Sequence, residues 1–247
     1  MKALIDGFLL PLQGLRIIFR PGFRRYVAVP LILNIVVFWA LAWVGTVYFG
    51  DFMGHYLPEN SWWSFLRPLA WVVFALAYAM VLFYGFTVLA NLIASPFNGI
   101  LAAKIEESLT GERPQGAEMS LMASIWPAIS AELNKLAYMA SRMIPLLILL
   151  LVSALIPGLN LIVSALWLLA GFWFLTVEYG DYPMANHDMP PKQQRQLLKR
   201  RRFKSLAFGA GVSGMMLFLG FVAMPAAVAG ATIYWARDLR KLERTSG

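Results

Sequence analysis

Two adjacent arginines follow a glycine near the start of the chain, in the stretch Pro21-Gly22-Phe23-Arg24-Arg25. Pro and Gly end the preceding helical pattern, and a long apolar segment begins directly afterwards. A helix N-terminus presents unpaired N–H groups, and arginine adds planar donors that suit a tetrahedral oxyanion. Gly22 also lets the backbone approach a ligand closely. The stretch is therefore either an oxyanion site, with the N–H groups of Gly22 and Phe23 directed at the anion, or an anchor whose arginines contact lipid phosphate.

A second group of charged side chains, Glu106, Arg113 and Lys135, lies in the most polar part of the chain, residues 104–142. Glu132 and Arg142 are nearby. Mixed charges between apolar flanks are compatible with a buried ion network near a pore mouth, although they are more typical of a solvated surface. The alternative is a solvated helical hairpin with surface ion pairs, which contribute little to stability.

A third group contains two carboxylates and a histidine, in Glu178-Tyr179-Gly180-Asp181-Tyr182-Pro183 and His187. These residue types suggest hydrolytic or metal chemistry, but their spacing matches neither a zinc template nor a catalytic one. We expect a helix-ending turn instead. The chain has no Cys and only two His, which excludes thiolate chemistry and a histidine-rich metal site. The sequence thus predicts no catalytic residue, no metal site and no cofactor.

The composition of the chain indicates a membrane protein. Of 247 residues, 60% are hydrophobic and only 14% are charged, whereas soluble domains are about half apolar and a quarter charged. Disorder and nucleic-acid binding are therefore excluded as the main property. The net charge of +8 comes from short basic blocks, which in a membrane protein report topology.

Four long stretches without any charged residue indicate where the membrane-embedded helices lie in the sequence. The first two predict long membrane-crossing helices at residues 23–50 and 68–103. The other two predict membrane hairpins at 143–177 and 205–236. In the first hairpin, Pro157-Gly158 is a strong turn signal. The piece before it, 144–155, would be about 18 Å long, short of a hydrocarbon core of about 30 Å.

The basic blocks support hairpins that return to the side from which they came. Residues 192–204 contain seven Lys and Arg and no acid, and both the N-terminal segment and the tail at 237–247 are basic. By the positive-inside rule all three blocks share the cytoplasmic face. Partly inserted hairpins satisfy this condition, and hairpins that cross completely twice fit the charges equally well.

The first 20 residues predict an amphipathic helix on the membrane surface. Apolar side chains recur at helical spacing: Leu4, Phe8, Leu12, Leu15, Ile18 and Phe19. We therefore expect one all-α membrane domain over residues 1–247. It comprises the surface helix, two long helices, the charged hairpin at 104–142, two partly inserted hairpins and the basic tail.

Several stretches resemble the CysZ sulfate-permease family of bacterial inner membranes. They are PGFRR, NLIASPFNGILAAKIEESLTG, EYGDYPMANH, FGAGVSG and MPAAVAGATIYW, in this order over nearly the whole chain. The resemblance implies a multi-pass inner-membrane protein that takes up sulfate for cysteine biosynthesis, by a channel-like or secondary mechanism. It also implies an all-helical fold with two long spans and two partly inserted hairpins, assembled as a homo-oligomer.

The resemblance also assigns residues. The family's sulfate motif corresponds to Gly22, Phe23, Arg24 and Arg25, with Phe23 where the family usually has Leu. The family's charge network corresponds to Glu106, Arg113 and Lys135. The expected partners are sulfate, with sulfite and related oxyanions left open, and membrane lipids, but not nucleic acid. The alternatives are a non-transporting membrane scaffold or assembly factor and a lipid-modifying membrane enzyme.

Overall fold

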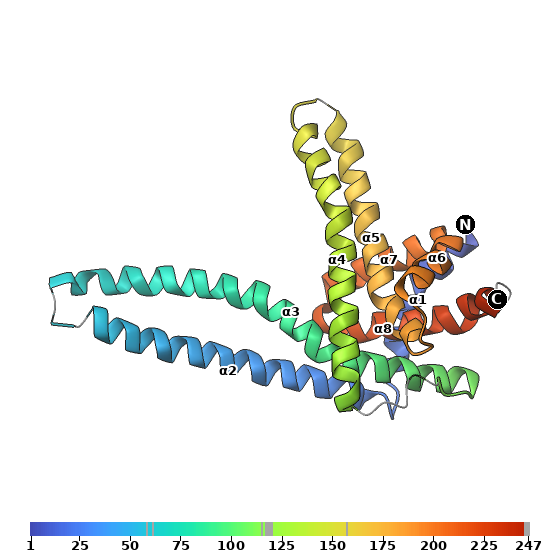
Figure 1. Ribbon diagram of the computed structural model, residues 1–247, viewed down its shortest axis with the longest axis horizontal. Helices are drawn as coiled ribbons and strands as arrows, with labels where there is room; N and C mark the ends of the chain where they lie inside the picture. Colours follow the sequence, from blue (N-terminus) through green and yellow to red (C-terminus); the bar gives the residue numbers. More distant parts are fainter. Residues whose placement is uncertain (58, 61, 115, 117–120, 157, 245–247) are drawn as a thin grey trace. The chain divides into compact units, whose positions relative to one another are not determined.

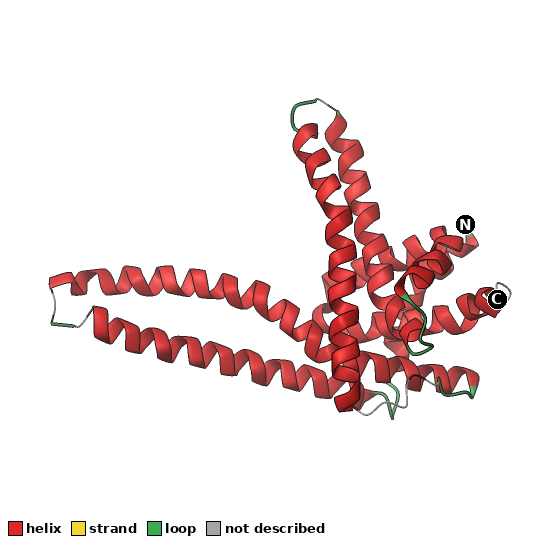
Figure 2. Cartoon of the chain, in the orientation of Figure 1, coloured by secondary structure: helices red, strands yellow, loops and turns green. Residues whose placement is uncertain are grey.

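The protein is helical throughout the part of the chain that the structure describes (Figures 1 and 2). This structure is a computed structural model of residues 1–247, and it describes all of them except 58, 61, 115, 117–120, 157 and 245–247. The elements are α1 (Lys2–Ile18), α2 (Arg24–Tyr56), η1 (Trp62–Leu66), α3 (Arg67–Thr110), α4 (Leu121–Ser153), α5 (Leu159–Ala185), α6 (Pro191–Arg200), α7 (Arg202–Leu219), η3 (Gly220–Val222), α8 (Ala223–Tyr234), η4 (Trp235–Leu239) and α9 (Arg240–Arg244).

Several of these helices are long and apolar enough to cross a membrane. Within the described residues there are five such stretches: Arg24–Tyr56, Ser64–Thr110, Ile129–Ser153, Leu159–Ala185 and Arg202–Glu243. The last is interrupted at Gly220, whose φ of 49° ends α7. The first two correspond to the long helices that the first two charge-free stretches predict.

Helix α4 is longer than the sequence suggests. It runs for 33 residues without interruption, through the charged segment and into the apolar one, and is therefore about 50 Å long. The expectation of a helix of only about 18 Å before the turn is wrong, because charged residues within α4 do not end it. Pro157 lies outside the described residues, and Gly158 adopts a φ of 85° directly before α5.

Helix α5 also continues beyond its expected end. It includes Glu178, Asp181 and Pro183 and ends at Ala185, so this stretch is not the helix-ending turn that its sequence suggests. Its carboxylates are buried or half-buried rather than at a surface turn. The ion pairs described below explain how charged residues remain inside an otherwise apolar helix.

The chain divides into two compact units, residues 1–27 with 95–247, and residues 28–94. In the second unit, α2 and α3 lie side by side in opposite directions (Figure 1). Phe49 stacks on Phe74 at a centroid distance of 3.8 Å, and Phe38 contacts Phe86 at 5.2 Å. Most other side chains in this unit are exposed and apolar, as in a helix pair that faces lipid.

The core of the first unit is built around α8, which is buried on nearly all sides. Helices α1, α5 and α7 pack against it. One face of α1 is exposed and carries Leu4, Phe8 and Leu12. The opposite face, with Gly7, Leu10, Gly14 and Ile17, is buried. Helix α1 is therefore amphipathic, but it is docked on the helical core, and Ile18 of the expected surface stripe is buried with it.

The contact between α1 and α8 depends on Gly14. A Cβ atom at this position would overlap the carbonyl oxygen of Ala226 and the backbone nitrogen of Gly230. We expect Gly14→Ala to lower the free energy of unfolding by roughly 1–3 kcal/mol, the usual effect of overpacking. Thermal unfolding in detergent measures this. The control is Gly171→Ala in α5, where a Cβ meets no atom within 4 Å and the helix should gain stability. Equal effects of both substitutions would contradict the packing.

Candidate functional site

The Gly22–Arg25 stretch forms the turn that joins α1 to α2. Gly22 is exposed and has a φ of 97°, a conformation that favours glycine. Phe23 is half-buried against the hydrophobic core of the first unit, and helix α2 begins at Arg24. Arg24 and Arg25 are both exposed. Packing of Phe23 therefore holds the turn in place while both guanidinium groups reach solvent at a helix N-terminus.

One hydrogen bond of this turn differs from those expected for the anion site. The N–H group of Phe23 donates to the carbonyl oxygen of Arg20 at 3.3 Å, so it closes the turn and does not point at a ligand. Arg24 Nε donates to the carbonyl oxygen of Phe19 at 2.7 Å, and Arg25 Nη2 donates to Tyr26 Oη at 3.0 Å. Each contact orients a guanidinium that has five N–H donors in all. Each arginine is therefore oriented by one hydrogen bond and retains further N–H donors that could bind an anion.

Lys135 lies in a buried cluster of carboxylates that joins α4 to α5. Its Nζ atom is 2.8 Å from Glu132 Oε1, 3.4 Å from Glu178 Oε1 and 3.4 Å from Asp181 Oδ2. It also lies 4.8 Å from the centre of the Tyr182 ring, within range of a cation–π contact. One lysine is thus shared by three carboxylates in an apolar environment, where a carboxylate without a nearby cation would be very unfavourable.

Glu132 extends the same cluster to α3. Its Oε1 atom accepts hydrogen bonds from Ser95 Oγ at 3.0 Å and from Tyr182 Oη at 3.2 Å, in addition to the contact with Lys135. Ser95 belongs to α3, Glu132 to α4 and Tyr182 to α5. The cluster therefore connects three helices through one carboxylate oxygen.

Glu106 lies in a separate cluster that includes the C-terminal part of the chain. Its side chain is 1% exposed, and its Oε1 atom is 2.8 Å from His187 Nε2 and accepts a hydrogen bond from Trp235 Nε1 at 3.0 Å. His187 follows α5, and Trp235 opens η4. A buried carboxylate needs such partners, because burial without them costs free energy.

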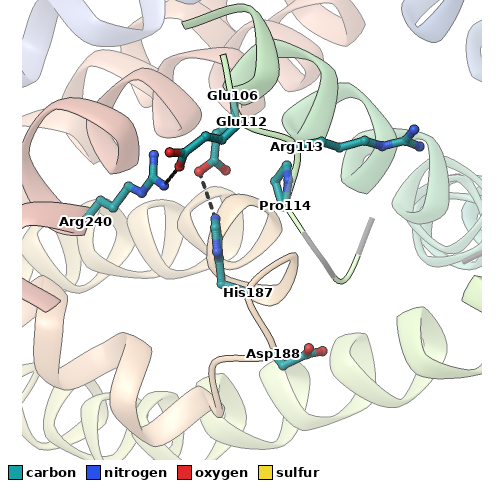
Figure 3. Close-up of a pocket in the computed structure, with 7 residues that line it drawn as sticks. All are labelled: Glu106, Glu112, Arg113, Pro114, His187, Asp188 and Arg240. Carbon is teal, nitrogen blue, oxygen red and sulfur yellow. Dashed lines mark hydrogen bonds and ion pairs between the residues drawn. The ribbon is translucent and has the colours of Figure 1, made fainter. Parts of the chain in front are cut away.

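Glu106 and His187 line a pocket of about 380 Å³ (Figure 3). Its other lining residues are Glu112, Arg113, Pro114, Asp188 and Arg240. Arg240 of α9 forms an ion pair with Glu112 at the edge of this pocket. The pocket is therefore polar and carries both signs of charge.

The three residues of the expected charge network do not form one cluster. Glu106 and Arg113 line the same pocket, but the Arg113 side chain points away from the Glu106–His187 pair (Figure 3). Lys135 contacts Glu132, Glu178 and Asp181 instead. Glu106 and Lys135 are nevertheless buried, so for these two positions the interpretation as surface ion pairs is wrong. Lys104 and Glu107 come closer to that interpretation, since they form a half-buried pair at 2.9 Å.

The sequence pattern does not by itself place Glu178, Asp181 and His187 in these clusters. A signal was present, since Glu132 and Lys135 are three residues apart, as are Glu178 and Asp181, and both pairs flank long apolar stretches. Residues three apart on a helix share a face. Ionisable residues in apolar helices usually pair with one another and mark functional positions.

Comparison with known proteins identifies the family. Residues 10–227 match the family described as Sulfate transporter CysZ/Etoposide-induced protein 2.4. Proteins named Sulfate transporter CysZ from Pseudomonas aeruginosa (strain LESB58) and Pseudomonas syringae pv. tomato are each 38% identical to this chain. The alignments cover 92% of this chain in both cases, and 92% and 90% of the respective relatives. A protein of that name from Pectobacterium atrosepticum is 38% identical over 94% of this chain and 85% of its own length. With its several membrane-length helices, this multi-pass membrane protein belongs to the Sulfate transporter CysZ/Etoposide-induced protein 2.4 family.

Proposed function

We propose that this protein takes up sulfate across the bacterial inner membrane and so supplies sulfur for cysteine biosynthesis. The observation that carries the proposal is the pair of exposed arginines at the first turn of a membrane-length helix, in a chain whose relatives are named sulfate transporters. The protein is accordingly a transporter and not an enzyme. In this proposal the arginines are a binding site, and their contact with lipid phosphate is the alternative.

The sulfate ion binds at the Gly22–Arg25 turn. Arg24 and Arg25 together carry two positive charges, which balance the two negative charges of sulfate. The N-terminus of α2 adds the positive end of its dipole and its first unpaired N–H groups. Phe23 contributes through packing, since its N–H group is already occupied. Sulfite and related oxyanions of similar shape and charge bind by the same contacts, whereas chloride is too small to engage all the donors together.

The buried clusters serve to position helices. The Lys135 cluster carries three carboxylates against one lysine, so it repels a divalent anion and is not a sulfate site. Its contacts instead fix α3, α4 and α5 relative to one another. Glu106 has a similar role, because it ties the end of α3 to His187 and Trp235.

Uptake into proteoliposomes tests the proposed function. Vesicles that contain the purified protein should accumulate radiolabelled sulfate down a concentration gradient, with saturation and with competition by sulfite. A tenfold excess of chloride should have little effect. Uptake equal to that of protein-free vesicles, by a protein that is folded and inserted, would favour the non-transporting scaffold.

We further propose that the α4–α5 and α7–α8 pairs enter and leave the membrane on one face, and that the protein is a homo-oligomer. The basic run at 192–204 joins the two pairs and favours one cytoplasmic side for all four helix ends. The resemblance to the CysZ family supports the oligomer, whose mass light scattering in detergent measures.

Cysteine labelling distinguishes partial insertion from complete crossing. The chain lacks Cys, so Leu155→Cys and Phe221→Cys each introduce a single exposed thiol at the tip of a helix pair. We expect an impermeant maleimide to label neither from the periplasmic side of intact cells, because the tips lie within the bilayer. Lys192→Cys is the control and should react only in inside-out vesicles. Efficient labelling of either tip from outside would contradict partial insertion and favour two complete crossings.

A further inference from the structure

Helices α1, α5 and α7 enclose an apolar hollow on the surface of the first unit. Its volume is about 460 Å³, and its lining includes Leu4 and Phe8 of α1, Phe172 of α5, and Leu206 and Ala210 of α7. All the residues that line it are apolar. Leu4 and Phe8 are 46% and 47% exposed, so the hollow is open along one side.

One end of the hollow is strongly basic. A Cβ atom at Gly7 would meet the backbone of Lys204, so the second turn of α1 lies beside the first turn of α7 and Lys2 is one turn further along. Lys2, Arg201 and Arg202 lie at this end and are exposed. On α7, Arg202, Leu206 and Ala210 are four residues apart and share one face, and the Arg202 guanidinium lies 5.1 Å from the centre of the exposed Phe203 ring.

The same end also carries two helix N-termini. Neither α1 nor α7 has a side chain that caps its N-terminus, and neither has an acidic residue in its first turn. The N-terminus of α1 therefore adds to the positive potential, whereas that of α7 directly follows the C-terminus of α6, whose dipole opposes it. Asp6 is the only acid in α1, and the three basic side chains outweigh it.

We propose that this hollow binds an anionic glycerophospholipid, with an acyl chain against Leu4, Phe8 and Leu206 and the phosphate between Lys2 and Arg202. An apolar cavity that ends in exposed basic groups has the charge pattern of such a molecule. A second copy of the chain fits less well, because it carries the same basic run and a net charge of +8. The site is independent of sulfate binding at Arg24 and Arg25.

Native mass spectrometry of the detergent-purified protein tests the proposal with dioleoylphosphatidylglycerol and dioleoylphosphatidylcholine as probes. The protein should retain the anionic lipid preferentially. Lys2→Gln with Arg202→Gln should weaken its binding by about fivefold for each charge removed. The control is Lys192→Gln with Lys241→Gln, which removes two exposed charges outside the hollow and should change binding little. Equal retention of both lipids, or equal losses in the two double variants, would overturn the proposal.

A second experiment fills the hollow with a larger side chain. Ala210→Phe should reduce retention of phosphatidylglycerol, and Ala77→Phe on exposed α3 should not. Leu4→Trp fills the same space from α1 and replaces Ala210→Phe if that variant does not fold. Unchanged retention in the filled variants would show that the lipid binds elsewhere. A change in oligomer mass in place of lipid loss would identify a second copy as the occupant and overturn the proposal.

Discussion

Replacement of Arg24 and Arg25 together by alanine should abolish measurable sulfate binding while the protein still folds and inserts. Loss of a charge-assisted hydrogen bond costs about 1.5–3 kcal/mol, or about ten- to a hundredfold in affinity for each arginine. Micromolar affinity, on the order of 8 kcal/mol, suits a scavenging system. A site of micromolar affinity that loses both guanidinium groups should therefore bind no measurable sulfate. Equilibrium dialysis with radiolabelled sulfate measures the effect.

The matched control removes two other exposed basic residues, Lys199 and Arg200, by the same substitution. This variant should bind sulfate like the parent. Arg24→Lys should retain part of the affinity, because it keeps the charge but loses the planar donors and the contact with Phe19. If the Arg24→Ala and Arg25→Ala double variant binds sulfate as well as the parent, the two arginines are lipid anchors and the site lies elsewhere.

Replacement of Lys135 by alanine should cause a large loss of stability. The substitution leaves Glu132, Glu178 and Asp181 close together and without their shared cation. Removal of one partner from a buried ion pair costs roughly 3–5 kcal/mol. Thermal or denaturant-induced unfolding in detergent should show this loss, and uptake per folded molecule should decrease because α3, α4 and α5 are no longer held together.

Two further variants show whether Lys135→Ala destabilises the protein through the lost charge or only through the shorter side chain. Lys104→Ala removes a lysine of a half-buried pair that is partly open to solvent and should cost about 1 kcal/mol. Neutralisation of the remaining carboxylates, by Glu178→Gln and Asp181→Asn in the Lys135→Ala background, should restore much of the stability. If the carboxamide substitutions destabilise the protein further, the cluster does not depend on the ion pairs that its geometry indicates.

The sequence predicts the helical class and the positions of the long apolar helices because charge-free stretches of membrane length permit few other structures. It does not predict the length of α4. That helix continues through Glu132 and Lys135 because these two residues pair with each other, and Lys135 also contacts carboxylates of α5 more than 40 residues away. Similarly, the glycines of α1 are needed because backbone atoms of α7 and α8 approach them closely. The spacing of residues within α1 does not predict this contact.

The sequence predicts those parts of the candidate sulfate site whose residues are close together in the chain. Gly22 and the two arginines lie within four residues, and the turn between α1 and α2 is apparent from Pro21 and Gly22. The sequence does not predict that the N–H group of Phe23 is occupied, because this depends on how the turn closes. The buried clusters combine residues from α3, α4 and α5, or from α3, η4 and the segment that follows α5, so their full membership depends on tertiary packing.

A structure determined with selenate in place of sulfate tests the central claim most directly, because selenium gives an anomalous signal that locates the anion. We expect one oxyanion at the turn between α1 and α2, with its oxygens within hydrogen-bond distance of the guanidinium groups of Arg24 and Arg25. At saturating selenate, density at another position and none between these arginines would contradict the proposed site.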